Sequence, residues 1–456
     1  MSVTTSARDL RLERLIEAEE AGFRERHPRS RDLLARARRS LAGGVASSWQ
    51  TTDPHPVYVS HGRGSRVWDV DGNDYVDLHN GYGAVAVGHA HPAVVEAVSR
   101  RVARGTHFAQ PTEEALLVAE HLRERFGLPL WRFGNSGTEA TLDATRLMRA
   151  VTGRDVVLKI EGSYHGHHDA LMVSVTPPAD AVGPADDPVS VPQTPGLPDA
   201  YVKLTRVVPF NDLAALERAL ARQRGRVAGL VVEPVMMNIG MVLPDDGYLA
   251  AARELLHRHG ALLAFDEVKT GATIHHGGAT RRFGVEPDLI CLAKSAGGGL
   301  CIGAIGGSEE VMGWVADGRI DQVGTFNGNP LSMAAALAAL TQALTPEAYT
   351  IFERQARLLR EGCDEVLARH GVEAQTTALA ARGAITYRRE RARNYRDFLE
   401  ASDELAYANW LVQLNRGVFL PPWGKAENWT LSVQHSDDDV LRFVENLEVL
   451  AAAVGG

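Results

Sequence analysis

Cysteine is scarce in this sequence and long apolar runs are absent. The chain of 456 residues has three cysteines, Cys291, Cys301 and Cys363, an odd number without disulfide or zinc-site spacing. No run of eighteen or more apolar residues occurs. The first forty positions are too charged for the apolar segment of a secretory signal. We therefore expect a cytoplasmic protein with reduced cysteines and no membrane-spanning segment.

Positive charge is not in excess either. Lys and Arg number 48 against 57 Asp and Glu, which gives a net charge of -9. This balance supplies no general attraction to nucleic acid or to anionic lipid, so neither is expected as a partner. The apolar content of 45% is enough for a substantial core. A globular protein of one large domain, or of two to three smaller ones, fits this length.

Short apolar runs alternate with helical patterns between about residues 112 and 310. Nearly continuous apolar runs are typical of strands buried on both faces, and they predict an α/β fold with a mostly parallel sheet covered by helices. Ligands bind beyond the carboxyl ends of such strands. The runs are 156–160, 227–232, 261–265 and 289–292.

The flanking segments have a different pattern. The first forty residues predict a charged helix that ends near Gly43-Gly44, and three antiparallel strands follow, with a turn at Asp71-Gly72. Pro, Asp and Gly over 174–198 predict a surface loop. A long helical region over 330–370 leads into a mixed α+β tail. The strands are predicted over 57–59, 66–70 and 75–78.

A lysine follows the last apolar run of the predicted sheet. Lys294 stands where burial of an ammonium group is costly, and Gly297 to Gly299 let the backbone pass close by. A desolvated lysine has a lowered pKa and becomes a nucleophile toward aldehydes, and as a Schiff base it loses the charge that burial penalises. Lys294 is therefore the first candidate catalytic residue.

Three further stretches reach the same edge of the sheet. Ser136, Gly137 and Thr138 precede a helix whose free amides suit a phosphate, although an ordinary N-cap explains them equally well. Asp266 ends a strand and either holds a protonated ring nitrogen or caps a helix. Residues 162–169 contain three histidines whose spacing matches no closed metal site, so no metal is predicted, and Tyr164 is suited to stack on a flat ligand.

Pyridoxal phosphate gives each of these residues a partner. It supplies the aldehyde for Lys294, the ring nitrogen for Asp266, and the phosphate for the helix N-terminus, and it is an electron sink for carbanions. We therefore predict pyridoxal 5'-phosphate (PLP) as the cofactor.

Six motifs together resemble the class III aminotransferases of fold type I, over the chain from about residue 40 onward. Within that family the sequence is most similar to the glutamate-1-semialdehyde 2,1-aminomutases, through Gly43-Gly-Val45, Gly88-His-Ala-His-Pro92 and 233–240. The six motifs are Asn135-Ser-Gly-Thr-Glu-Ala140, Tyr164-His-Gly-His167, Glu233-Pro-Val235, Asp266-Glu-Val268, Ala293-Lys-Ser-Ala-Gly-Gly-Gly299 and Gly324-Thr-Phe-Asn-Gly-Asn-Pro330.

The resemblance implies an architecture. We expect a large domain with a mostly parallel seven-stranded sheet flanked by helices, and a small α+β domain built from the N- and C-terminal segments. The predicted boundaries are 1–80 for the N-terminal helix and antiparallel segment, 81–335 for the large PLP-binding domain and 336–456 for the C-terminal small domain.

The resemblance also implies roles for single residues. Lys294 would form the Schiff base and move protons, Asp266 would pair with the ring nitrogen, and Tyr164 would stack on the ring opposite Val268. Asn238 would reach the ring hydroxyl, while Thr325 would reach the phosphate of the neighbouring subunit in a homodimer. The implied catalytic residues are Lys294, Asp266 and Tyr164, and the implied cofactor-binding set is Ser136, Gly137, Thr138, Tyr164, His165, Glu233, Asn238, Asp266, Val268, Lys294 and Thr325.

The substrate pocket departs from the aminomutase pattern. Aminomutases have an arginine for the substrate carboxylate where this chain has Gln50, and the arginine of related β-amino-acid aminotransferases is Ser47 here. A neutral amide cannot replace a bidentate cation. Trp49 and Tyr82 make the predicted pocket more aromatic, whereas Glu427 resembles the aminomutase glutamate near the substrate amine.

We therefore predict an aminotransferase that moves an amino group from an amine or amino acid to a keto acid or other carbonyl acceptor. The alternative is a glutamate-1-semialdehyde 2,1-aminomutase, which returns the amino group to a neighbouring carbon of the same molecule. Racemase, decarboxylase or lyase chemistry on the same cofactor, and a non-catalytic PLP-binding scaffold, are the remote alternatives.

Overall fold

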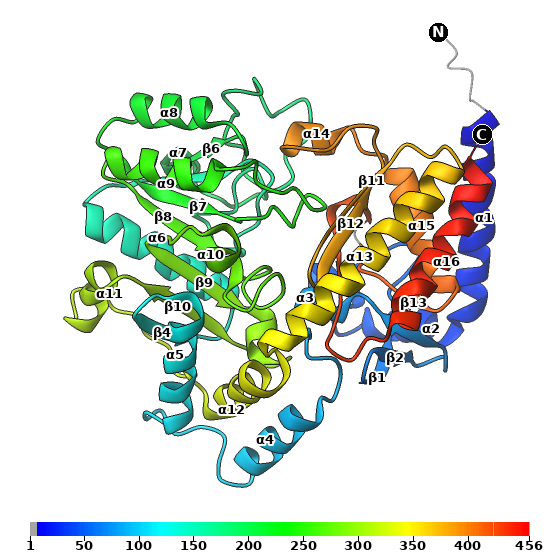
Figure 1. Ribbon diagram of the computed structural model, residues 1–456, viewed down its shortest axis with the longest axis horizontal. Helices are drawn as coiled ribbons and strands as arrows, with labels where there is room; N and C mark the ends of the chain where they lie inside the picture. Colours follow the sequence, from blue (N-terminus) through cyan, green and yellow to red (C-terminus); the bar gives the residue numbers. More distant parts are fainter. Residues whose placement is uncertain (1–6, 423, 456) are drawn as a thin grey trace.

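A seven-stranded sheet lies at the centre of the larger part of the molecule (Figure 1). The computed structural model describes residues 7–422 and 424–455. The strand order is β4-β10-β9-β8-β7-β5-β6, and every strand is parallel to the others except β10. The predicted α/β class and the mostly parallel seven-stranded sheet are thus confirmed. The strands are β4 (Leu130–Gly134), β5 (Val156–Ile160), β6 (Thr205–Val208), β7 (Val227–Val232), β8 (Leu262–Asp266), β9 (Leu289–Ala293) and β10 (Gly303–Gly307).

Helices cover both faces of this sheet, as the apolar runs predict. In β9, Leu289 and Cys291 pack in the cluster that contains α6 and α11, whereas Ile290 and Leu292 pack in the cluster that contains α5 and α9. Side chains of successive strand residues point to opposite faces, so each face requires its own apolar cover. The helices around the sheet are α5 (Glu113–Phe126), α6 (Gly137–Thr152), α7 (Asp199–Leu204), α8 (Leu213–Arg222), α9 (Tyr248–Arg258), α10 (Gly278–Phe283) and α11 (Glu309–Ala316).

Two smaller sheets lie outside the central one, and the first of them joins the beginning of the chain to its end. One has the order β1-β2-β3-β13, in which β13 pairs in parallel with β3, and the other has the order β11-β12-β14. Figure 1 shows α1, α15 and α16 side by side on the outside of this part. The strands are β1 (Val59–Arg63), β2 (Arg66–Asp69), β3 (Asp74–Asp77), β11 (Gln375–Leu379), β12 (Arg382–Thr386), β13 (Val418–Phe419) and β14 (Trp429–Thr430).

The remaining helices connect and cover these sheets. The chain at 346–369 forms the longest helix, α13, which packs against α16. These helices are α1 (Ala7–Arg26), α2 (Pro28–Ala37), α3 (Asn80–Gly83), α4 (Pro92–Val102), α12 (Pro330–Ala338), α13 (Pro346–Arg369), α14 (Tyr395–Leu399), α15 (Asp403–Asn415) and α16 (Asp437–Val454), with short turns of 3-10 or π type at Ala42–Gly44, Ser48–Gln50, Lys294–Gly297, Ala339–Ala343 and Gly424–Ala426.

The N-terminal segment differs from its prediction in two details. The expected single helix is two helices, because Pro28 lacks the N–H that would continue α1 and instead begins α2. The first antiparallel strand begins at Val59 rather than Val57, although Tyr58 O still accepts a hydrogen bond from Val70 N at 2.8 Å. The turn at Asp71-Gly72 is confirmed, with a positive φ at Gly72.

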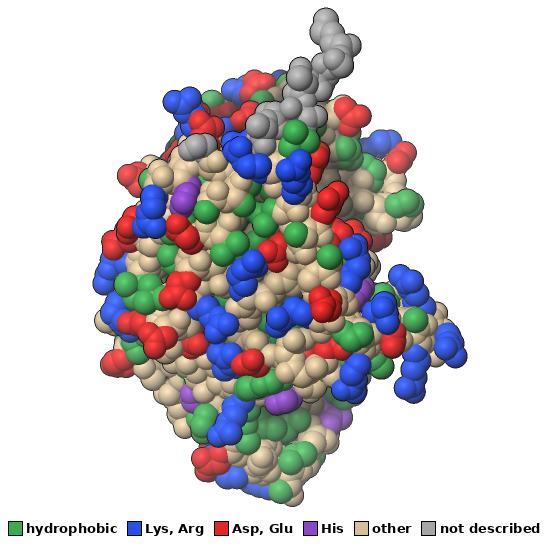
Figure 2. All heavy atoms as spheres, turned by 90° about the vertical axis from the view of Figure 1, so that its right-hand side faces the viewer, with side chains coloured by type: hydrophobic (Ala, Val, Ile, Leu, Met, Phe, Trp, Pro, Cys, Tyr) green, Lys and Arg blue, Asp and Glu red, His purple; other side chains and the backbone are tan. Residues whose placement is uncertain are grey.

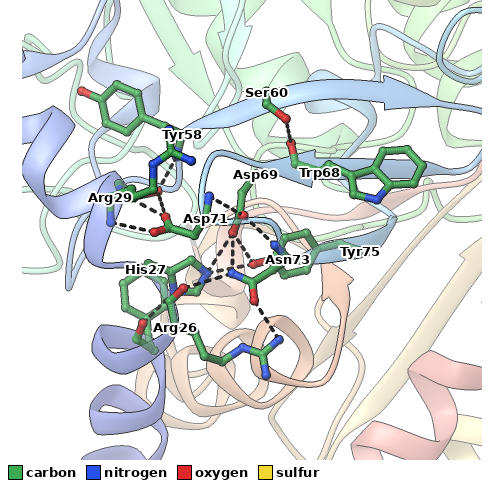
Figure 3. A network of polar contacts seen from close by, with 12 residues as sticks. Arg26, His27, Arg29, Tyr58, Ser60, Trp68, Asp69, Asp71, Asn73 and Tyr75 are labelled. Carbon is green, nitrogen blue, oxygen red and sulfur yellow. Dashed lines mark hydrogen bonds and ion pairs between the residues drawn. The ribbon is translucent and has the colours of Figure 1, made fainter.

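A buried polar network fixes α1 and α2 to the turn between β2 and β3 (Figure 3). Asp69, which is 3% exposed, accepts hydrogen bonds from the Tyr75 hydroxyl at 2.8 Å and from the Asn73 amide at 2.9 Å. His27 is fully buried and contacts the same hydroxyl through Nε2 at 2.8 Å. Asp71 accepts from the backbone N–H of Ser30 at 3.0 Å. Because each of these polar groups has a partner, α1, α2 and the turn between β2 and β3 are held in one arrangement.

On the face that carries α1 and α16, acidic and basic side chains are interspersed rather than gathered into one patch (Figure 2). Within residues 7–422 and 424–455, no helix has both the length and the apolar content needed to cross a bilayer.

Candidate active site

A cavity of about 490 Å³ opens where the parallel strands end. The carboxyl ends of β8 and β9 and the loops after β4, β5 and β7 contribute its floor, while residues 47–50, the α3 turn and Glu427 line its other side. Parallel strands bring all their carboxyl ends to one sheet edge, which explains why residues more than a hundred positions apart meet here.

Lys294 lies directly after β9 and lines the cavity. Its backbone has a φ of 51°, a left-handed conformation that a non-glycine residue adopts only where the surroundings impose it. Burial lowers the pKa of the Lys294 ammonium to about 8, and the nearby positive charges of Lys269 and Arg382 act in the same direction. A larger fraction of this amine is therefore unprotonated near neutral pH than in an exposed lysine, although the ammonium form still predominates at pH 7.

Asp266 ends β8 and is held from two sides. Its Oδ2 contacts His165 Nδ1 at 2.7 Å, and its Oδ1 accepts a hydrogen bond from Val268 N at 3.0 Å. Both carboxylate and imidazole are buried, and no hydrogen-bond partner for His165 Nε2 lies among the described residues. The arrangement fixes a carboxylate at the cavity wall, where it can stabilise a positive charge on a ligand.

The loop after β4 presents the N-terminus of the sixteen-residue helix α6 to the cavity. Ser136 is the N-cap, and its side chain accepts a hydrogen bond from Glu139 N at 3.2 Å. Added Cβ atoms would lie 2.8 Å from Val268 Cγ2 at Gly137 and 2.2 Å from Ser136 O at Gly303, so glycine is required for this close packing. The free N–H groups of the first turn suit an anion, which favours the phosphate interpretation.

Glu233 joins two loops at the cavity. It follows β7, is 3% exposed, and accepts hydrogen bonds from Tyr164 N at 2.9 Å and Met237 N at 2.8 Å. Both Glu233 and Asn238 line the cavity. The two loops therefore hold Tyr164 and Asn238 in fixed positions relative to the sheet.

Three aromatic rings form the opposite wall. The ring centroids of Trp49 and Tyr82 are 5.8 Å apart, and those of Trp49 and Tyr164 are 5.5 Å apart with an interplanar angle of 78°. The Tyr82 hydroxyl donates to Trp49 O at 2.5 Å. Gln50 lines the cavity beside them and accepts from Ala46 N at 3.0 Å. The structure thus brings together the four residues expected in the substrate pocket, since Glu427 also lines it.

Thr325 is placed elsewhere. It is exposed, lies outside the residues that line the cavity, and has Val323 and Phe326 as neighbours that are 82% and 56% exposed. Every other candidate cofactor residue, from Ser136 to Lys294, lines the same cavity.

Three basic residues of the site were not found by sequence analysis. Lys269 and Arg382 lie near Lys294, the first in the cavity wall and the second buried behind it. Lys159 in β5 is fully buried and donates to Ser163 O, Leu171 O and Val173 O at 2.8, 3.1 and 2.6 Å, which fixes the loop that carries Tyr164. Lys159 interrupts the apolar run 156–160, and a lysine within a predicted buried strand could have indicated a buried cation with a structural role.

The donor set fits pyridoxal phosphate. The cavity presents a lysine amine with a lowered pKa, a fixed buried carboxylate, the free amides of α6 and aromatic side chains on one side. Among the described residues no group of three or more His, Cys, Asp or Glu side chains has the geometry to hold a metal ion. The requirements of an aldehyde, a protonated ring nitrogen and a phosphate are each matched by one of these features.

Comparison with known proteins gives the same result. The profile of the family "Aminotransferase class-III" matches residues 47–404. The chain is 38% identical to glutamate-1-semialdehyde 2,1-aminomutase of Methanopyrus kandleri, over 94% of this chain and 98% of the relative.

Solved structures of both kinds of enzyme are similar. An omega-transaminase from Sphaerobacter thermophilus has a TM-score of 0.86 and 36% identity, covering 93% of this chain and 97% of the other. A glutamate-1-semialdehyde aminomutase from Pseudomonas aeruginosa, in complex with PMP, has a TM-score of 0.89 and 32% identity, covering 98% and 99%. The predicted resemblance, enzyme class and cofactor are confirmed. The chain is a PLP-dependent enzyme of the fold type I class and belongs to the class III aminotransferase family.

Proposed function

We propose that this enzyme transfers an amino group from an amine or hydrophobic amino compound to a separate carbonyl acceptor. The single observation that carries this proposal is the substrate side of the cavity. Trp49 and Tyr82 supply apolar surface there, Ser47 and Gln50 are neutral, and no arginine of the described chain lines the cavity. An aromatic and neutral wall suits a donor without a carboxylate next to its reacting carbon.

The bound cofactor would supply an aldehyde for the donor amine and a ring that accepts the charge of a carbanion. Lys294 is proposed to hold that aldehyde and afterwards to move a proton between the two reacting carbons as general base and acid. Its lowered pKa of about 8 supports this role, because a general base is most efficient when its pKa lies close to the working pH.

The other residues of the cavity are proposed to bind the cofactor and to orient it. The Asp266 carboxylate keeps the ring nitrogen protonated, and its hydrogen bond from His165 fixes its direction. Ser136, Gly137 and Thr138 hold the phosphate at the start of α6. Tyr164 and Val268 enclose the ring.

Glu233 and Asn238 have further proposed roles in this site. Glu233 keeps the loops on either side of the cavity in place through its two backbone contacts. Asn238 is positioned to reach the ring hydroxyl, since it lines the cavity on the loop that Glu233 holds.

The second candidate is the glutamate-1-semialdehyde 2,1-aminomutase. Curated relatives between 36% and 40% identical to this chain, each matched over 90% of it or more, carry that name, so the relatives favour this alternative over two-substrate exchange. Glu427, which lines the cavity, also resembles the aminomutase glutamate near the substrate amine and so favours this alternative. The missing arginine at Gln50 is the observation against it.

A homodimer with shared active sites is part of the proposal. Thr325, Val323 and Phe326 are exposed on a loop that Asn135 Nδ2 ties to the phosphate side through Asn327 Oδ1 at 3.2 Å. Exposed apolar side chains next to a site are typical of an interface, and Thr325 would then reach the partner's phosphate. We also expect the protein in the cytoplasm.

Incubation of the purified holoenzyme with a panel of amines, with and without pyruvate or 2-oxoglutarate, tests the main proposal. Turnover should require both donor and acceptor. Conversion of glutamate-1-semialdehyde without any acceptor would overturn two-substrate exchange in favour of the aminomutase.

A further inference from the structure

A lysine and a glutamate form an ion pair in the wall of the cavity. Lys269 Nζ lies 3.1 Å from Glu427 Oε2 and donates to Met237 O at 2.8 Å. The side chains are 8% and 5% exposed, and both line the cavity. An ammonium group has three N–H donors, so these two contacts leave one donor of Lys269 for a ligand.

A second cation lies behind this pair. The Arg382 guanidinium is 1% exposed, and its hydrogen bonds go to neutral oxygens: Asn428 Oδ1, Thr430 Oγ1, Thr273 Oγ1 and Lys269 O. Within the described chain no carboxylate lies at ion-pair distance from it. Glu427 still acts on it electrostatically, because its charge raises the pKa of Arg382 against the lowering by burial.

The charges of this cluster do not balance. Lys269 and Arg382 together carry two positive charges, and Glu427 supplies one negative charge. An excess positive charge in a mostly buried cluster is costly unless an anion completes it. A carboxylate at the free N–H of Lys269 would bring the cluster to neutrality.

The other basic groups of the cavity are committed elsewhere. Lys294 serves the chemistry, and His165 is held by Asp266 at 2.7 Å. Gln50, which is expected at the position of the aminomutase arginine, is neutral. Lys269 is thus the one cation on the cavity wall of the described chain with a donor available for a substrate anion.

We propose that Lys269 binds the carboxylate of the carbonyl acceptor, with Arg382 adding positive charge behind it. The assignment rests on the proposed two-substrate exchange and names the acceptor class: a keto acid whose carboxylate reaches the Lys269–Glu427 wall. The aromatic wall of Trp49 and Tyr82 then receives the donor, so one cavity accepts a neutral amine and an anionic acceptor in turn.

Binding of an unreactive carboxylate tests this without any turnover. We would titrate the holoenzyme with propionate and with the neutral isostere propionamide by calorimetry. In Lys269→Met the dissociation constant of propionate should rise by about tenfold or more, the usual effect of losing a charge-assisted hydrogen bond. The propionamide constant should change much less, and Lys269→Arg should retain most of the propionate affinity.

Kinetics give the second measurement. The ratio of kcat/KM for pyruvate to that for acetaldehyde should fall by about tenfold in Lys269→Met, because acetaldehyde is pyruvate with a hydrogen in place of the carboxylate. A general effect on Lys294 would lower both values and leave the ratio unchanged. An unchanged ratio, or equal losses of propionate and propionamide affinity, would overturn the proposal.

If Lys269→Met does not fold, a variant that is expected to strengthen propionate binding tests the same proposal. Glu427→Gln removes the competing carboxylate and should tighten propionate binding by several-fold, whereas no change or weaker binding contradicts the proposal. Conversion of glutamate-1-semialdehyde without an acceptor would overturn the exchange reaction. Propionate affinity would still report separately on Lys269.

Discussion

The two sides of the cavity are held by different kinds of structure. On the cofactor side, Asp266 ends a central strand, Lys294 follows the next strand, and Ser136 caps a long helix. On the substrate side, Trp49 and Tyr82 lie on short turns, and Tyr82 has a φ of 55°. The proposed cofactor side is thus held by regular elements, whereas the proposed substrate side lies on turns, which are free to vary and so to set specificity.

The two sides of the cavity also differ in how their polar side chains are hydrogen-bonded. The buried carboxylate of Glu233 accepts a hydrogen bond from Tyr164 N of a neighbouring loop, and that of Asp266 contacts His165 Nδ1 of the same loop, so their positions are tied to the fold. Gln50, by contrast, is exposed and accepts one bond from Ala46 N within its own loop. Substitutions on the cofactor side should therefore abolish function, whereas those on the substrate side should redirect it.

The largest effect is expected for Lys294→Ala. Loss of the amine that moves the proton should lower kcat with an amine donor and pyruvate by about 10³- to 10⁴-fold. Rate measurements at saturating substrate, with a melting curve to confirm folding, would check this. Activity above about one part in a hundred would contradict the role of Lys294.

A smaller loss is expected for Asp266→Asn. The amide keeps the shape but lacks the charge that stabilises a protonated ring nitrogen, so kcat should fall by about 10²- to 10³-fold. The cofactor content per subunit must be measured in parallel, because it separates weaker binding from slower chemistry. A loss of less than tenfold in a fully loaded variant would mean that Asp266 is not the ring partner.

Gly303→Ala tests the packing beneath the phosphate loop. The new Cβ would lie 2.2 Å from Ser136 O, so the loop must move, and we expect unfolding to become easier by about 1–3 kcal/mol. Gly313→Ala is the matched control: outside its own helix, no atom of the described residues lies within 4 Å of a Cβ added there, and alanine favours helix α11 by about 0.5–1 kcal/mol. Denaturant unfolding of both variants would decide, and equal stabilities would refute the steric account.

The pH dependence of stability reports on the burial of Lys294. Its native pKa is about 8 and its ordinary value is 10.5, so between these values the unfolded chain binds a proton that the native protein has released. The free energy of unfolding of the cofactor-free protein should therefore rise with pH across this window. Relative to Lys294→Met, the gain should be about 2–3 kcal/mol, measured by denaturant unfolding at pH 7 and pH 10. A flat difference would mean that the pKa is not lowered.

The smallest effect is expected on the substrate side. Gln50→Arg should raise kcat/KM for carboxylate-bearing amino donors by about threefold to tenfold, since the new charge is exposed and water screens it. Neutral amines of similar size provide the control. If the specificity constants of both donor classes stay the same, Gln50 does not occupy the arginine position of the relatives.

Much of the cofactor side could be predicted from the sequence. Continuous apolar runs predicted the parallel strands, and the carboxyl ends of those strands identified Lys294 and Asp266 as neighbours. The pairing of His165 with Asp266 and the basic cluster of Lys269 and Arg382 could not be predicted. Lys269 follows β8 of the central sheet, whereas Arg382 lies 113 positions further on, in β12 of a smaller sheet. Nothing local in the sequence indicates their contact.

The sequence by itself determined the fold class, the cofactor and the lysine that would carry the chemistry, because strand burial and helix starts depend on local pattern. Only the tertiary structure decided which charges gather at and behind the cavity wall, because Lys269, Glu427 and Arg382 come from three separate segments whose distances depend on the packing of the whole chain. The strength of an electrostatic interaction depends on the distance between charges in space, not on their separation along the chain. The grouping of these three charges therefore could not be predicted from the sequence.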